Sequence, residues 1–332
     1  MSNTPLLDII RYLFVLEVNS PYIRLPQWPA MEFSLLLGEN ISDRLPITEA
    51  RAWKKSLAAW DGKKNDKMTK GKLLAYQPSP WPIDAVIFWY PAKKSYGRGE
   101  LILFELKLFG KAAEHQFFLE FILPAMEYLA RTPRIESGNS NSVWGHFDIR
   151  SIYSAKGRLW KPLLKNGKLD LRRRVNPAQW AHGIDFKTDP FNPMNQLHWL
   201  SPFKIKAFSK NNIVSQKDNQ IFAPQLYSIL ESVAQRINSV ILGKYSTAQD
   251  FLSSLEKDEL EAWKHAMKHA MRCSIHRNNI KKAFDLPYGG MAKGSQTFSS
   301  KIPDILLPYL GLGAIIHIGE YTHFGCGTYV LY

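Results

Sequence analysis

The chain has 332 residues, of which 45% are apolar and 13% are aromatic, enough to build ordinary hydrophobic cores and to exclude a disordered polymer. Its 43 lysines and arginines outnumber its 29 aspartates and glutamates, which leaves a formal charge of +14. A surplus of that size attracts polyanions, so nucleic acid is the first candidate partner and an anionic membrane surface is the second.

Little in the sequence favours the membrane. No apolar run approaches the roughly 20 residues that a spanning helix needs, and residues 1–18 lack the basic start of a signal peptide. The two cysteines, Cys273 and Cys326, form neither a disulfide framework nor a Cys-x-x-Cys zinc motif. We therefore expect a reduced, cytoplasmic protein without a membrane partner.

The first half of the chain begins with a strand, because Tyr12, Phe14 and Leu16 recur with the period of two that is typical of a half-buried strand. In chain order we expect a strand at 10–18, helical segments at 31–40 and 48–60, strands at 83–90 and 100–109, a helix at 114–131 and a strand at 145–153. This order, β-α-β-β-α-β, is that of the ferredoxin-like unit and predicts an N-terminal domain over residues 1–155.

Residues 156–196 read as a basic linker, because "RLWKPLLKNGKLDLRRR" and "TDPFNPMNQ" are rich in charge, proline and asparagine. The same order of elements then recurs, with a strand at 197–208, helices at 226–241 and 255–272, short strands at 273–278 and 294–300, a helix at 303–318 and a strand at 327–332. The predicted class is α+β, with two tandem ferredoxin-like (RRM-like, βαββαβ) domains. The second domain covers residues 197–332 and contains a glycine-rich loop.

The most specific pattern is the closing segment "LLPYLGLGAIIHIGEYTHFGCGTYVL", an apolar helix, a loop with Gly319, Gly325 and Gly327, and a final strand. Arg272 with Ser274, "YGGMAKG" at 288–294 and "GRGELILFELKLFGKA" at 97–112 add to it. Together these segments resemble the RAMP superfamily of CRISPR systems. Within it, they resemble the endoribonucleases that cut CRISPR repeat RNA into guide RNAs.

The resemblance implies metal-independent attack of a ribose 2′-OH on the adjacent phosphate, without a cofactor. It also implies that the partners are CRISPR repeat RNA, the mature crRNA and other subunits of a CRISPR effector complex. Two positions depart from the family. Its loop often has a lysine after the first glycine, where Glu320 stands here, and its early catalytic histidine is missing, since the first histidine here is His115. A non-catalytic RNA-binding subunit is therefore the alternative, and charge alone also allows a DNA-binding scaffold.

The implied reaction needs a base for the 2′-OH, positive charge at the phosphate and an acid for the leaving 5′-oxygen. Histidine suits the base and the acid because its pKa lies near neutrality. We predict catalytic roles for Tyr22, Lys54, His276 and His323. His323 is expected to be exposed in the loop, whereas His317 is expected to be buried at the end of the helix and bonded to the backbone.

Basic residues near these positions, together with the loop glycines, are the predicted RNA contacts, because cations bind phosphates without reading sequence. They are Arg24, Arg51, Lys55, Arg158, Lys161, Arg172, Arg173, Arg174, Lys204, Arg272, Arg277, Lys281, Lys282, Lys293, Gly319, Gly325 and Gly327. His265 and His269 share one helical face with the spacing of a metal pair, but the segment lacks the glutamate of a zinc-protease motif. No metal site is predicted.

Overall fold

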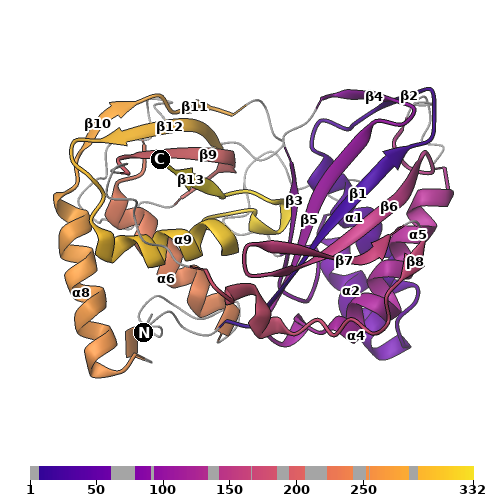
Figure 1. Cartoon of the computed structure of the whole chain (residues 1–332), viewed down its shortest axis with the longest axis horizontal. Helices are drawn as coiled ribbons and strands as arrows, with labels where there is room; N and C mark the ends of the chain where they lie inside the picture. The colour runs from indigo at the N-terminus through magenta and orange to yellow at the C-terminus, as the bar shows by residue number, and fades with distance from the viewer. Residues whose placement is uncertain are drawn as a thin grey trace. The chain divides into compact units, whose positions relative to one another are not determined.

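The computed structural model describes residues 7–60, 79–90, 93–133, 142–165, 167–184, 194–205, 223–241, 252–253, 255–283 and 291–332. The chain divides into two compact units (Figure 1), residues 8–183 and residues 184–332, and Leu7 groups with the second. Within the described ranges, no helix is both long and apolar enough to cross a membrane. The predicted mixture of helices and antiparallel strands is confirmed, and each unit is described by itself below.

A sheet in the order β3-β5-β1-β6-β7-β8 forms the first unit. β1 (Ile9–Val18) lies antiparallel between β5 (Leu101–Phe109) and β6 (Phe147–Lys156), and β3 (Ala85–Trp89) is antiparallel to β5. These four strands stand in the spatial order second, third, first, fourth. This is the arrangement expected when each helix of a β-α-β-β-α-β unit crosses over one face of the sheet.

Helices α1 (Pro29–Ser42), α2 (Ile47–Ala58) and α5 (Leu123–Arg131) lie along one face of this sheet (Figure 1). The fully buried Tyr12 and Phe14 of β1 form the core beneath them: the Tyr12 ring stacks on Phe118 at 3.8 Å and the Phe14 ring on Phe104 at 4.6 Å. The alternation of β1 therefore has the predicted cause, since every second side chain is buried in an aromatic core.

The helix predicted at 114–131 is interrupted. The chain forms the short 3₁₀ turn η1 (Gly110–Ala112) and then α4 (His115–Phe117), the π-helical η2 (Phe118–Ile122) and α5. Pro124 lies at the start of α5. A proline has no N–H to donate to the preceding turn, so the helical ladder changes its spacing just before it.

The predicted linker differs most from the structure. β7 (Leu159–Lys165) pairs antiparallel with β6, β8 (Lys168–Leu169) pairs with β7, and the 3₁₀ helix η3 (Pro177–Ala181) follows, so these residues belong to the first unit. The unit ends at Gly183, not at residue 155. Strands near a sheet edge often carry lysine and proline, as β7 does at Pro162, and such a composition resembles that of a linker. Residues 185–193 of the predicted linker lie outside the described ranges.

A separate two-stranded sheet was not predicted. It pairs β2 (Tyr22–Arg24) with β4 (Ser95–Gly97) in antiparallel register, with Ile23 opposite Tyr96. Both strands have only three residues, which is too short for a pattern of alternating burial to be recognised in the sequence.

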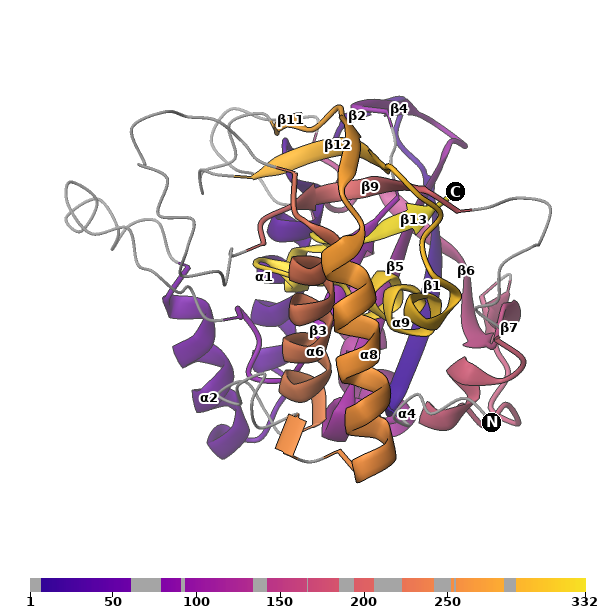
Figure 2. The ribbon, with the colours of Figure 1, turned by 90° about the vertical axis from the view of Figure 1, so that its left-hand side faces the viewer.

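The second unit contains a sheet in the order β10-β12-β9-β13, with β11 also paired to β12. The strands are β9 (Gln196–Phe203), β10 (Ile275–Asn278), β11 (Lys281–Lys282), β12 (Ala292–Phe298) and β13 (Tyr329–Leu331). Strands β9, β10, β12 and β13 repeat the spatial order of the first unit. Figure 2 shows α6 (Leu226–Ile241), α8 (Lys257–Arg272) and α9 (Leu307–Ile316) on one face of this sheet.

Helix α9 approaches α6 closely at Gly313. A Cβ atom built on Gly313 would lie 2.5 Å from Val233 Cγ2 and 2.6 Å from the hydroxyl of Tyr329. That hydroxyl donates a 2.7 Å hydrogen bond to the carbonyl of Leu310, so α9 is bonded directly to the last strand. The short 3₁₀ helix η4 (Asp304–Leu306) leads into α9, and η5 (Thr322–Phe324) lies in the loop that follows it.

Candidate nucleic-acid interface

Positive charge gathers along one edge of the sheet of the second unit. The residues Arg272, His276, Arg277, Lys281, Lys282 and Lys293 lie at the end of α8 and on β10, β11 and β12, and we call them the basic edge. All except the half-buried Lys293 are exposed. Figure 1 shows β10 and β11 beside β12, so these residues lie along one strip of the sheet.

Two features of the backbone shape this edge. The register between β10 and β12 shifts so that Ile275 faces Phe298 and Arg277 faces Thr297, which leaves His276 as the extra residue of a β-bulge. A bulge turns its side chain away from the regular ladder and is common next to functional sites. On β11, Lys281 stands directly opposite Lys293, which concentrates two ammonium groups at one point of the strip.

The glycine-rich loop, residues 319–327, is built mainly by contacts within its own unit. Gly319 and Gly327 have φ angles of +87° and +81°, and a Cβ on either would overlap a backbone carbonyl oxygen, that of Lys204 or of Ile318 respectively. The N–H of Gly327 donates to Pro202, that of Glu320 to Lys204 and that of Gly325 to Thr322. A side chain at Gly319 would therefore block the approach of the loop to the end of β9, and one at Gly327 would block its approach to Ile318.

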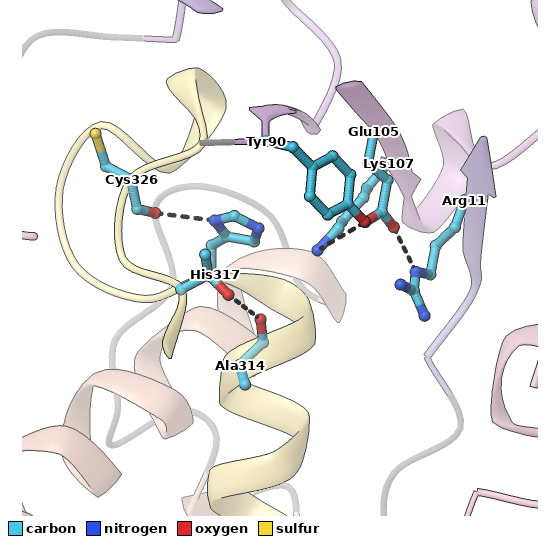
Figure 3. Close-up of polar contacts among 8 residues, drawn as sticks. Arg11, Tyr90, Glu105, Lys107, Ala314, His317 and Cys326 are labelled. Atoms are coloured by element: carbon cyan, nitrogen blue, oxygen red, sulfur yellow. Dashed lines mark hydrogen bonds and ion pairs between the residues drawn. The ribbon is translucent and has the colours of Figure 1, made fainter. Parts of the chain in front are cut away.

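The sequence prediction is right for one histidine of this region and wrong for the other. His317 is fully buried at φ 61°, and a hydrogen bond of 3.1 Å joins its Nδ1 to the carbonyl of Cys326 (Figure 3), so the predicted buried, backbone-bonded histidine is confirmed. His323 was expected to be exposed, but only 5% of it is, and its ring packs edge-on against Phe324 at 5.7 Å. The η5 turn directs His323 inward, so the expectation of exposure is wrong.

Lys204, a predicted RNA contact, is already paired. Its ammonium lies 2.8 Å from the Glu320 carboxylate and 5.9 Å from the centre of the Tyr321 ring. Glu320 stands directly after Gly319, the first glycine of the loop. The Glu320 carboxylate offsets the charge of Lys204, which lowers the positive charge of the loop at neutral pH.

The predicted site residues of the first unit lie on separate elements. Tyr22 and Arg24 are exposed on β2, and the Tyr22 hydroxyl is 3.1 Å from Ser95 Oγ. Arg51, Lys54 and Lys55 are exposed on α2, where Lys54 lies 3.5 Å from the Asp43 carboxylate. The hydroxyl and the ammonium proposed for catalysis thus contact neighbours of their own unit.

The remaining predicted RNA contacts lie on or beside β7 and β8 of the six-stranded sheet. Arg158 is exposed in the turn between β6 and β7, and Lys161 is half-buried on β7. Arg172, Arg173 and Arg174 follow β8, and Arg172 forms a 3.1 Å ion pair with Asp170. Because β7 and β8 belong to the sheet, these cations are held on a folded surface instead of on a linker.

A buried charged cluster in the first unit was missed in the sequence. Glu105 is 2% exposed; it accepts a 2.5 Å hydrogen bond from Arg11 Nε and one from the Tyr90 hydroxyl, and the Lys107 ammonium is 3.9 Å away (Figure 3). Burial alone would raise the pKa of Glu105, but Arg11 and Lys107 outweigh it and hold this pKa below its ordinary value. The sequence feature that could have revealed this cluster is the pair Glu105 and Lys107 on one face of a strand that is otherwise apolar.

The two histidines of α8 lie on one helical face, as expected from their spacing of four. His265 is exposed, His269 is half-buried, and their Nε2 atoms lie 3.3 Å apart. Among the residues that the structure describes, no group of three or more His, Cys, Asp or Glu side chains is arranged to hold a metal ion.

Comparison with known proteins leaves the sequence without a match, since no family model and no curated protein matches it. A chain of a partial Cas6-RT-Cas1–Cas2 complex matches in structure, with a TM-score of 0.55 and 15% identity over 98% of this chain. The fold is shared with this chain of the complex. A chain of the Cas6-RT-Cas1–Cas2 complex gives the same TM-score of 0.55 and 15% identity over 98% of this chain.

This chain spans only 46% and 29% of the lengths of those two chains. A Cas6 product complex is matched over 98% of this chain and 100% of its own, with 12% identity and a TM-score of 0.48. The likeness of fold rests on the first two structures.

Proposed function

We propose that the chain is an endoribonuclease that binds CRISPR repeat RNA, cuts it without a metal ion and retains the mature crRNA. The observation that carries this proposal is the basic edge on a fold shared with a Cas6-containing chain. The two units, residues 8–183 and 184–332, are then tandem ferredoxin-like domains. Other proteins of a CRISPR system are the expected protein partners.

In the proposed reaction the ribose 2′-oxygen attacks the adjacent phosphorus while a base removes the 2′-OH proton. The bond from phosphorus to the 5′-oxygen breaks, and an acid protonates that oxygen, leaving a 2′,3′-cyclic phosphate and a 5′-OH. His276 is the strongest of the proposed acid–base groups, because it is exposed at a β-bulge among cations that attract the phosphate backbone. Tyr22 and Lys54 stay proposals for orienting the 2′-OH and for offsetting charge.

His323 receives a different role. Its burial in η5 favours a positioning residue that supports the glycine-rich loop over a proton donor at the phosphate. Gly319 lets this loop approach the backbone of Lys204, just after β9, and Gly327 lets it approach Ile318.

The second candidate is a non-catalytic RNA-binding subunit. It is favoured by the burial of His323 and by the existing contacts of Tyr22 with Ser95 and of Lys54 with Asp43. On this alternative the basic edge binds RNA, but no acid and base act on one phosphate.

One experiment separates the two. The purified full chain is incubated in EDTA with the repeat RNA of the CRISPR array in the same genome, and with a twin of that RNA that carries a 2′-deoxy sugar at the cut position. The proposal predicts a cut in the first RNA, none in the second, and equal binding of both. Equal binding with no cut in either RNA supports the subunit alternative, and the absence of binding refutes both.

The basic edge is tested by charge removal. Replacing Arg272, Arg277, Lys281 and Lys282 with glutamine should weaken RNA binding by about 10²-fold at 0.15 M salt, because each lost phosphate contact costs roughly fourfold. The matched control removes four exposed cations of the first unit: Lys111, Arg131, Lys156 and Lys165. An equal loss of affinity in the two variants would mean that RNA responds to net charge and not to this edge.

A further inference from the structure

A cavity of about 420 Å³ lies wholly within the first unit. Its lining includes His115 and Leu119 from the helical segment, Leu163 from β7, and Arg173, Arg174 and Asn176 from the chain between β8 and η3. The volume falls in the range of roughly 300–1,000 Å³ that is typical of small-ligand sites. The lining combines apolar side chains with a few groups that bind anions, which is how such sites are usually built.

A hydrogen bond to a buried tyrosine fixes the orientation of the His115 ring. A hydrogen bond of 2.9 Å joins its Nδ1 to the hydroxyl of Tyr12, which is fully buried and stacked on Phe118 at 3.8 Å. Because Tyr12 takes up Nδ1, Nε2 is the ring nitrogen that His115 can offer to a ligand. A histidine fixed in this way resembles one that is oriented by a second residue for work at its other nitrogen.

The charge of the cavity is positive. Arg173 and Arg174 line it, and the carboxylate of Asp170, the acidic residue among the described lining residues, is already paired with Arg172 at 3.1 Å. Guanidinium groups bind phosphate through paired hydrogen bonds. Leu119 and Leu163 supply an apolar surface of the kind on which a base can lie.

We propose that this cavity binds one phosphate-bearing nucleotide of single-stranded RNA. Arg173 and Arg174 hold its phosphate, His115 Nε2 makes a hydrogen bond to it, and the base lies against Leu119 and Leu163. The nucleotide belongs to the RNA of the proposed function, so the inference rests on that function. It gives the chain a second contact with RNA, in the first unit, at residues that are separate from the basic edge.

The test uses the full chain labelled with ¹³C and ¹⁵N in histidine, so that the imidazole signals can be followed by NMR. His115 is assigned from the signal that disappears in His115→Gln. The probes are uridine 3′-monophosphate, uridine and inorganic phosphate. We expect the nucleotide to shift the His115 signal saturably and to bind about tenfold more tightly than uridine or inorganic phosphate, since its base and phosphate act together.

The variants decide which residues matter. Replacing Arg173 and Arg174 with glutamine should weaken the nucleotide about tenfold, because charge-assisted hydrogen bonds to phosphate are lost. The matched control His182→Gln removes an exposed histidine of the same unit and should change nothing. A His115 signal that does not move would overturn the inference. The inference would also be overturned by equal affinity for inorganic phosphate and the nucleotide, or by an unchanged affinity for the nucleotide when both arginines are replaced.

The same proteins separate this inference from the proposed function. If the wild type cuts repeat RNA but the nucleotide does not bind, the cavity proposal alone is wrong. If the nucleotide binds and repeat RNA is neither bound nor cut, the proposed function fails and so does the statement that the nucleotide belongs to RNA.

Discussion

Replacing Gly327 with alanine should destabilise the second unit strongly. The residue has a φ of +81°, where an L-residue costs about 1–2 kcal/mol, and its Cβ would overlap the Ile318 carbonyl oxygen and lie 2.9 Å from the carbonyl carbon. Moving that carbonyl also strains the 3.0 Å hydrogen bond from the Ile318 N–H to the Gly327 carbonyl. Overpacking adds about 1–3 kcal/mol and a weakened hydrogen bond about 1 kcal/mol, so we expect a total of about 3–6 kcal/mol.

Gly99 is the matched control. Its φ is also +81°, but a Cβ built on it meets nothing within 4 Å, so Gly99→Ala should cost only the roughly 1–2 kcal/mol of the left-handed backbone. Hydrogen exchange in urea measures each unit separately, through the amides of β9 for Gly327→Ala and those of β1 for Gly99→Ala. Equal losses of stability in the two variants would refute the argument that the loop is fixed by its contact with Ile318.

Three further predictions concern single charges. Glu105→Ala should cost about 3–5 kcal/mol of unfolding free energy, because it removes the buried carboxylate that pairs with the Arg11 guanidinium. Glu17 forms an exposed ion pair with Arg150, so Glu17→Ala should cost less than about 1 kcal/mol, and urea unfolding measures both variants. Burial lowers the pKa of His115, so the unfolded state binds more protons and the free energy of unfolding should fall as the pH drops below about 6.5. His115→Gln should make that fall smaller when urea titrations at pH 7 and pH 5 are compared. An unchanged difference between the two pH values would contradict the prediction. Glu320→Gln removes the carboxylate that pairs with the Lys204 ammonium, so RNA binding in a filter-binding assay should tighten roughly fourfold at 0.15 M salt. Weaker binding would show that Glu320 itself contacts the RNA.

Local pattern predicted the parts of the fold that have local causes. The alternation of Tyr12, Phe14 and Leu16 was sufficient to find β1, and the position of His317 at the end of an apolar helix was sufficient to predict its burial. β7 was missed because Pro162 and the lysines around it are as compatible with an edge strand as with a linker. Only pairing with β6 decides between them, and a single segment does not reveal its pairing partner.

The site depended even more on contacts between distant residues. His323 was expected to be exposed because its loop is rich in glycine, but the η5 turn and the bonds from Glu320 and Gly327 to the end of β9 bury it. The cavity lined by His115 also needs residues from β7, from the chain after β8 and from the helical segment, so no single stretch of sequence contains all of its lining residues. The basic edge was found more readily, because most of its cations lie within a short stretch after α8.

The most direct test of the account is to map the ends of the RNA fragments after a single-turnover incubation of the full chain with its repeat RNA in EDTA. The account predicts one cut at one phosphate, with a 2′,3′-cyclic phosphate on one fragment and a 5′-OH on the other. It also predicts that the basic-edge variant loses this cut while the variant at Lys111, Arg131, Lys156 and Lys165 keeps it. Intact RNA with the wild-type chain, cuts at many positions, or a 5′-phosphate at the new end would contradict it.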